Sequence, residues 1–113
     1  LKWVPVTDDG ALDMEAYAGL LGPRTKFVSL TQMSNALGTV TDAKTIIELA
    51  HAYNIPVLLD GCQGAVHLPT DVQALDVDFS VFSGHKVYGP GGIGVLYAKS
   101  ELLEGMLHYL GVV

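Results

Sequence analysis

The chain has 113 residues, of which half are hydrophobic and only 16% are charged. Six Lys and Arg against twelve Asp and Glu give a formal net charge of −6. This composition excludes an intrinsically disordered segment, because disorder requires low hydrophobicity and high net charge. The acidic balance argues against nucleic acid as the main partner, since no basic patch is present to neutralise phosphates. No apolar run reaches the roughly 20 residues that span a bilayer.

The cysteine count and the two ends of the chain add further expectations. A single cysteine, Cys62, excludes an internal disulfide framework and favours a reducing compartment, so we expect a cytoplasmic protein. The chain begins without Met in what reads as a strand, shows no signal-peptide layout, and ends at Val113 without a polar tail. We therefore expect residues 1–113 to be one segment of a single domain within a longer chain.

Apolar periodicity and turn residues predict elements along the first half of the chain. In order, they are an extended piece at 3–6, a helix at 13–21, a strand at 26–30, a polar loop at 31–41 and a helix ending near 53. Thr41 or Asp42 is expected to cap that second helix, because short polar side chains accept hydrogen bonds from free N–H groups of a first turn.

The second half is predicted to contain strands at 57–60, 78–82 and 93–97 and a helix at 100–107. The wholly apolar run from Val57 to Leu59 is typical of a strand covered on both faces. Strands that alternate with helices predict an α/β fold with a layered, mostly parallel sheet. Four aromatic residues are expected in its core: Tyr17, Phe27, Phe79 and Phe82.

Three polar clusters follow predicted strands at the point where each strand ends. They are Ser34-Asn35, Asp60 with Gln63, and Ser83 with His85 and Lys86. Ligands of open α/β sheets bind outside the carboxyl ends of the strands. One crevice is therefore expected to collect a carboxylate, an amide, a hydroxyl, an imidazole and an amine.

This set of groups matches the chemistry of one cofactor. An amine with a lowered pKa forms a Schiff base with a carbonyl, and a neighbouring carboxylate keeps a heterocyclic nitrogen protonated. Hydroxyl and imidazole donors beside a glycine-rich turn bind phosphate. An aldehyde, a pyridine nitrogen and a phosphate on one molecule describe pyridoxal 5'-phosphate.

The motif Asp60-Gly61-Cys62-Gln63, followed by Ser83-Gly84-His85-Lys86-Val87-Tyr88-Gly89-Pro90, resembles the cofactor-binding core of class V aminotransferase-type enzymes. The likeness is strongest to the group II (SufS-like) cysteine desulfurases, which include selenocysteine lyases. The stretches 34–39, 71–79 and 92–97 fit the same family. The resemblance implies the central part of the large domain of a fold-type I pyridoxal-phosphate enzyme. It also implies a mixed, mostly parallel sheet whose final strand is antiparallel.

The resemblance also implies a role for each site residue. Lys86 would be the Schiff-base lysine and the proton shuttle at the substrate Cα, and Asp60 would pair with the pyridinium nitrogen. The remaining roles are Gln63 on the ring phenolate oxygen, Ser83 and His85 on the phosphate, and Asn35 near the ring oxygen and the substrate carboxylate. No metal site is expected, since His51, His67 and His108 have no metal-ligand spacing.

The family reaction converts L-cysteine to L-alanine and leaves the sulfur as a persulfide on an enzyme cysteine. The implied role is sulfur supply for iron–sulfur cluster assembly by a homodimer that serves a sulfur-acceptor protein. Other class V chemistry (selenocysteine lyase, aminotransferase or epimerase) and a non-catalytic fragment that keeps only the fold are the alternatives. The family's persulfide cysteine, its carboxylate-binding arginine and its ring-stacking histidine fall outside these residues, so the segment alone is expected to be inactive.

Two positions depart from the family pattern. Gln32 stands where related desulfurases often have His, so the loop before Asn35 is expected to be tuned differently. Cys62 stands where small residues are common, and it is predicted to be a buried filler rather than a nucleophile. Some of these residues also have a purely structural interpretation. Asp60 could cap a turn, and Lys86 could be an ordinary surface lysine. Asp71, Asp76 and Asp78 are interpreted as turn and strand-edge residues.

Overall fold

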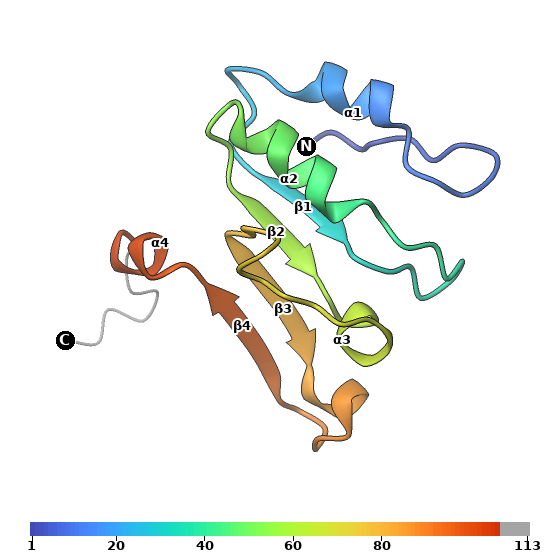
Figure 1. Cartoon of the computed structure of the whole chain (residues 1–113), viewed down its shortest axis with the longest axis vertical. Helices are drawn as coiled ribbons and strands as arrows, with labels where there is room; N and C mark the ends of the chain where they lie inside the picture. The colour runs from blue at the N-terminus through green and yellow to red at the C-terminus, as the bar shows by residue number, and fades with distance from the viewer. Residues whose placement is uncertain (107–113) are drawn as a thin grey trace.

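The computed structural model describes residues 1–106, which form a four-stranded sheet with two longer helices on one of its faces (Figure 1). The strands are β1 (Val28–Thr31), β2 (Val57–Asp60), β3 (Phe79–Ser83) and β4 (Gly94–Ala98). The helices are α1 (Met14–Leu20), α2 (Ala43–His51), α3 (Gly64–His67) and α4 (Ser100–Glu104), with one 3-10 helix, η1 (Gly84–Val87). In this part of the chain, none of the helices is long and apolar enough to cross a membrane.

The sheet has the order β1-β2-β3-β4. β1, β2 and β3 run parallel, and β4 pairs antiparallel with β3. The register places Thr31 beside Asp60, Asp60 beside Val81, and Val81 beside Leu96. The predicted α/β fold, with a mostly parallel sheet and an antiparallel final strand, is therefore confirmed.

Aspartate caps begin both longer helices. The Asp13 carboxylate accepts a hydrogen bond from the Ala16 N–H at 2.9 Å, and the Asp42 carboxylate accepts one from the Thr45 N–H at 3.2 Å. Each cap satisfies a backbone donor that the first helical turn leaves free. Asp42, one of the two predicted caps, is thus confirmed. The helix predicted at 100–107 begins at Ser100 as expected but ends earlier, at Glu104, with Gly105 as its C-cap. Leu107, the last residue of the predicted helix, lies outside the described residues.

The core lies between the sheet and the helices α1 and α2. Its largest fully buried side chains are Ile46, Ile47, Val57, Leu59 and Val77. Tyr17 of α1 is also buried, and its hydroxyl donates a hydrogen bond to the Ile46 carbonyl at 2.9 Å. Burying an aliphatic side chain of this size stabilises a fold by about 1.5–3 kcal/mol. These contacts hold α1 and α2 against the β1–β2 half of the sheet.

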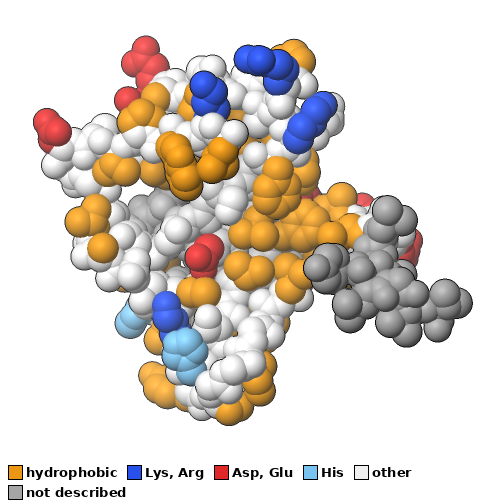
Figure 2. Space-filling model, turned by 180° about the vertical axis from the view of Figure 1, so that it is seen from behind, with side chains coloured by type: hydrophobic (Ala, Val, Ile, Leu, Met, Phe, Trp, Pro, Cys, Tyr) orange, Lys and Arg blue, Asp and Glu red, His pale blue; other side chains and the backbone are white. Residues whose placement is uncertain are grey.

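Two predictions about burial were wrong. Leu58 is only half-buried, because α1 and α2 cover the face that carries Val57 and Leu59 while Leu58 points to the opposite face. Phe27 is 48% exposed, and it contacts the half-buried ring of Phe79 at a centroid distance of 5.9 Å. Figure 2 shows apolar side chains gathered on the side of the molecule away from the viewer of Figure 1.

Three local elements also differ from the predictions. Residues 3–6 form no strand; Val6 makes an isolated antiparallel bridge with Leu12. The short helices α3 and η1 were not predicted. Each spans four residues, which is too short for a periodic pattern of apolar side chains to show.

Asp78 is a buried member of an ion-pair cluster rather than a strand-edge residue. It is 6% exposed and immediately precedes β3. One carboxylate oxygen accepts a hydrogen bond from the Val57 N–H at 2.7 Å and lies 2.7 Å from Nε2 of His51. The other lies 3.1 Å from Nζ of Lys99, which also pairs with Asp76. The cluster therefore joins the end of α2, the start of β2, the start of β3 and the end of β4.

The surroundings of Asp78 act on its pKa in opposite directions. Burial raises the pKa of the carboxyl, but hydrogen bonds from His51, the Val57 N–H and Lys99 together outweigh burial. The pKa of Asp78 therefore lies below its ordinary value. The ionised carboxylate is the form that the folded state prefers.

We expect Asp78→Ala to lower the free energy of unfolding by about 2–4 kcal/mol, because it leaves the Val57 N–H, the His51 ring and the Lys99 ammonium without this carboxylate. Urea unfolding of the variant and the parent measures this difference. Asp8→Ala is the matched control, since Asp8 is an exposed carboxylate in a turn. Equal losses from both substitutions would contradict a special role for the cluster.

We also expect acid to remove the contribution of this carboxylate. A folded pKa below the unfolded value, which is about 3.9 for Asp, adds stability that is present above that value. This stability is lost as pH falls through the folded pKa. Urea unfolding at a series of pH values should therefore show the difference between the parent and Asp78→Asn shrinking below about pH 4. A difference that stays constant from neutral to acidic pH would refute this linkage.

Candidate functional site

The carboxyl end of β3 leads directly into η1, which carries His85 and Lys86. The Gly84 N–H donates to the Ile93 carbonyl at 2.8 Å, and the Gly89 N–H donates to the Gly84 carbonyl at 2.9 Å. A Cβ on Gly89 would lie 2.9 Å from that same carbonyl oxygen, so only glycine fits there. The turn places Lys86, which is half-buried, and His85, which is exposed, immediately beyond the strand.

The carboxyl end of β2 forms a tight turn from Asp60 to Gln63. The Asp60 carboxylate accepts a hydrogen bond from the Cys62 N–H at 2.9 Å, and the Gly61 N–H donates to the Val81 carbonyl at 2.8 Å. Asp60 thus caps the turn, as its structural interpretation predicted. Within residues 1–106, its second carboxylate oxygen accepts no hydrogen bond. Gln63 stands at the N-cap of α3, where its side chain makes no capping bond.

The two strand ends are in direct contact. The Cys62 thiol lies 3.4 Å from the Ser83 hydroxyl, which joins the turn after β2 to the last residue of β3. Helix α3 also contacts η1. Because Asp60 pairs in register with Val81, Asp60 and Ser83 lie on the same face of neighbouring strands. This is the face that α1 and α2 leave uncovered.

The structure brings five of the six predicted cofactor residues to this region. Asp60 and Gln63 come from the turn after β2, and Ser83, His85 and Lys86 come from the end of β3 and from η1. Asn35 lies apart in the loop after β1, where it is exposed and makes no side-chain hydrogen bond to the other five among the described residues. That loop is held by Ser34, whose hydroxyl accepts hydrogen bonds from the Ala36 and Leu37 N–H groups at 3.2 and 3.1 Å. The role of Asn35 stays a prediction.

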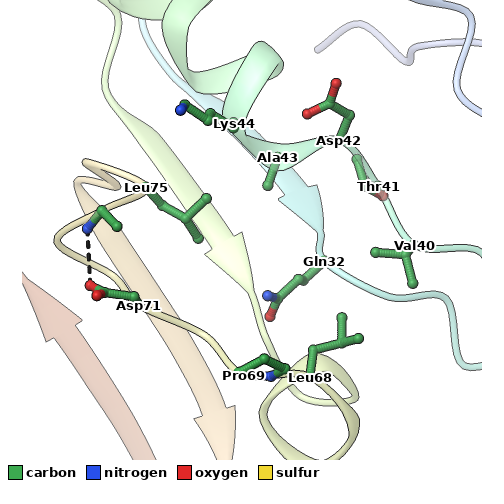
Figure 3. A pocket seen from close by; sticks show the side chains of 11 residues that line it. Gln32, Val40, Thr41, Asp42, Ala43, Lys44, Leu68, Pro69, Asp71 and Leu75 are labelled. Atoms are coloured by element: carbon green, nitrogen blue, oxygen red, sulfur yellow. Dashed lines mark hydrogen bonds between the residues drawn. The ribbon is translucent and has the colours of Figure 1, made fainter.

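Two hollows lie near these strand ends. One, of about 320 Å³, is lined by Cys62, Ser83 and residues of β3 and β4. The other, of about 460 Å³, lies between the N-terminus of α2 and the segment 68–75 (Figure 3). None of the predicted cofactor residues lines the second hollow. The first therefore belongs to the candidate site, and the second is separate from it.

The polar side chains at the carboxyl ends of β2 and β3 fit a ligand that carries a basic ring nitrogen, an aldehyde and a phosphate. A carboxylate with a free oxygen can pair with a protonated ring nitrogen. A half-buried amine can react with an aldehyde. The Ser83 hydroxyl and the His85 imidazole lie two residues apart beside a glycine-rich turn, and such donors can bind phosphate. Pyridoxal 5'-phosphate carries all three groups.

The family profile described as aminotransferase class-V matches residues 1–112. The chain belongs to this family. A cysteine desulfurase of Synechococcus elongatus is 63% identical over 107 residues, which are 95% of this chain and 17% of that protein. A cysteine desulfurase of Dickeya dadantii is 58% identical over 106 residues, which are 94% of this chain and 26% of that protein. The chain therefore spans about a quarter or less of the length of these class-V relatives.

Solved structures show the same fold for this class-V segment. The crystal structure of the cysteine desulfurase CsdA from Escherichia coli matches 89% of this chain with a TM-score of 0.85 and 50% identity, over 25% of its own length. The apo structure of the cysteine desulfurase from Thermococcus onnurineus matches 92% of this chain with a TM-score of 0.84 and 31% identity, over 26% of its own length. The resemblance inferred from the Asp60 and Lys86 motifs is confirmed.

Sequence reasoning missed what holds the turn after β2. Cys62, predicted to be a buried filler, is half-buried and contacts Ser83. Gln32, noted only as a departure from the family pattern, is buried beneath the turn. A polar residue directly after an apolar strand is a weak signal, because most such residues are solvated loop residues.

We expect Gly89→Ala to destabilise the fold by about 1–3 kcal/mol, because the new Cβ meets the carbonyl of Gly84, the first residue of η1. Urea unfolding of parent and variant measures the loss. Gly91→Ala is the matched control in the same turn, since a Cβ there would meet nothing within 4 Å. That control is expected to be neutral or slightly stabilising. Equal effects at the two glycines would contradict the steric argument.

Proposed function

We propose that this chain is the cofactor-binding part of a pyridoxal-phosphate-dependent cysteine desulfurase, which converts L-cysteine to L-alanine and retains the sulfur as a persulfide. The observation that carries the proposal is the identity of 63% and 58% to two cysteine desulfurases across almost the whole chain. The cluster of Asp60, Ser83 and Lys86 at adjacent strand ends supports it.

Each candidate residue has a proposed task at the cofactor. Pyridoxal phosphate, when bound, supplies an electron sink for negative charge that develops at the substrate Cα. Asp60 keeps the ring nitrogen protonated through its free carboxylate oxygen. Lys86 holds the cofactor as the Schiff-base lysine and moves the proton at Cα. Three further tasks are proposed: Gln63 donates to the ring phenolate oxygen, Ser83 and His85 hold the phosphate, and Asn35 lies near the ring oxygen and the substrate carboxylate.

The wider setting of the reaction is part of the same proposal. We take residues 1–113 as the central part of a large cofactor-binding domain in a longer chain. The whole protein would act as a cytoplasmic homodimer and pass sulfur to an acceptor protein for iron–sulfur cluster assembly. Support comes from the motifs of the SufS-like desulfurases and from a single cysteine in an acidic chain.

A second candidate function is amino-group transfer, since the family profile that matches the chain is named for aminotransferases. The two reactions use the same cofactor and the same lysine, but they release different products. A desulfurase releases alanine and sulfur, whereas an aminotransferase releases a keto acid and leaves its amino group on the cofactor. A comparison of L-cysteine with L-selenocysteine as substrates then tests the lyase alternative.

We expect borohydride reduction of the full-length protein, after incubation with pyridoxal phosphate, to label Lys86 selectively. Peptide mass analysis locates the label, and Lys2, Lys26, Lys44 and Lys99 serve as internal controls. Lys86→Ala should lower alanine formation from L-cysteine by about 10²–10⁴-fold, because it removes the proposed proton carrier. Lys44→Ala, which changes an exposed lysine of α2, should leave the rate unchanged.

The outcomes separate the alternatives. Selective labelling with alanine and sulfur as products supports the desulfurase. Selective labelling with a keto acid as product supports an aminotransferase and refutes the proposed reaction. Scattered labelling among the five lysines refutes the proposed site.

A further inference from the structure

Gln32 is the first residue after β1, and its backbone is fixed from two sides. Its N–H donates a hydrogen bond to the Asp60 carbonyl at 2.9 Å, and its carbonyl accepts one from the Thr41 N–H at 2.9 Å. The first bond continues the β1–β2 ladder up to the residue that begins the turn after β2. The backbone of Gln32 is therefore tied directly to that of Asp60.

The Gln32 side chain is buried beneath that turn. The residue is only 6% exposed, and its Nε2 donates a hydrogen bond to the Thr70 hydroxyl at 2.9 Å. Its Oε1 is buried and has no hydrogen-bond partner among the described residues. Leaving a buried carbonyl oxygen unpaired costs about 1–3 kcal/mol, so the position of this side chain calls for a structural explanation. Figure 3 shows the side chain extending from the end of β1 toward the segment that begins at Leu68.

Two glycines of the turn region accommodate this side chain. A Cβ on Gly64 would lie 2.0 Å from Oε1, 2.5 Å from Cδ and 2.9 Å from Cγ of Gln32. A Cβ on Gly61 would lie 3.3 Å from the same Oε1. The amide end of Gln32 therefore rests on the backbone on both sides of Cys62 and Gln63. Glycine at position 64 is what leaves room for glutamine at position 32.

We propose that Gln32 is a positioning residue, whose side chain fits against Gly64 and sets the position of the Asp60–Gln63 turn. This inference rests on the proposed function, because Asp60 and Gln63 are the groups assigned to the cofactor ring. Gln32 itself acts only through the turn. The pair formed by Gln32 and Gly64 thus adjusts where the carboxylate and the amide stand relative to Lys86.

A double-mutant cycle in the full-length protein tests this pairing. Gly64→Ala should raise the dissociation constant for pyridoxal phosphate, because the new Cβ pushes Gln32 and the turn apart. In a Gln32→Ala background the same change should have little effect, since the space is already vacant. We expect the two effects to differ by about tenfold, within the range for residues in contact. Additive effects would overturn the proposal.

A spectroscopic readout separates positioning from general stability. If the turn moves, Asp60 shifts relative to the ring nitrogen, and the pH titration of the bound cofactor's absorbance should change its midpoint in Gln32→Ala and in Gly64→Ala. Gln73→Ala and Gly19→Ala are the matched controls, because Gln73 is exposed and a Cβ on Gly19 would meet nothing within 4 Å. Variants that lose only thermal stability, with the parent's titration curve, would refute a positioning role.

A cofactor-free measurement distinguishes failure of this inference from failure of the proposed function. Cys62 lies inside the turn and is half-buried. Its rate of alkylation by iodoacetamide, followed by peptide mass in the apo protein, should rise in Gln32→Ala and Gly64→Ala but not in the two controls. A parent that binds no cofactor would refute the proposed function, while altered alkylation would still support the Gln32–Gly64 pairing. Unchanged alkylation in a parent that binds the cofactor would refute the pairing alone.

Discussion

The parallel pairing of β2 with β3 is the constraint on which the candidate site depends. Parallel strands end at the same edge of a sheet, so Asp60 at the end of β2 and Ser83 at the end of β3 become neighbours although 22 residues separate them in sequence. The contact between Cys62 and Ser83 closes this edge. A shift of one residue in the register would turn Asp60 to the helix-covered face and remove it from the cluster.

The Asp78 ion-pair cluster and the candidate site lie at opposite ends of β2 and β3. The Asp78 cluster joins α2, β2, β3 and β4 where β2 and β3 begin, and its hydrogen bonds there go to other residues of the fold. At the carboxyl ends, within residues 1–106, one oxygen of the Asp60 carboxylate accepts no hydrogen bond and Gln63 makes no capping bond. A fold that satisfies its buried polar groups at one end can leave others available for a ligand at the other end.

The face of the sheet that α1 and α2 leave uncovered carries several apolar side chains. Leu58, Phe79 and Val81 on this face are half-buried, and Leu96 is exposed. Solved structures that match 89% and 92% of this chain are about four times longer than the segment they share with it, since that segment is 25% and 26% of their length. Asp60 and Ser83 lie on the same face as these apolar side chains, which places the candidate site at the border of a surface that the described residues leave open.

The sequence by itself determined the order of the main elements, the capped helix after Asp42, the mixed sheet and the motifs around Asp60 and Lys86. These signals are local: apolar spacing, capping residues and turn residues act within a few positions of each other. Only the tertiary structure decided that Phe27 is exposed, that Asp78 is buried in an ion-pair cluster, and that Gln32 fits against Gly64. Each of these depends on residues at least 20 positions apart, and their proximity follows from strand pairing and helix packing, which no local pattern encodes.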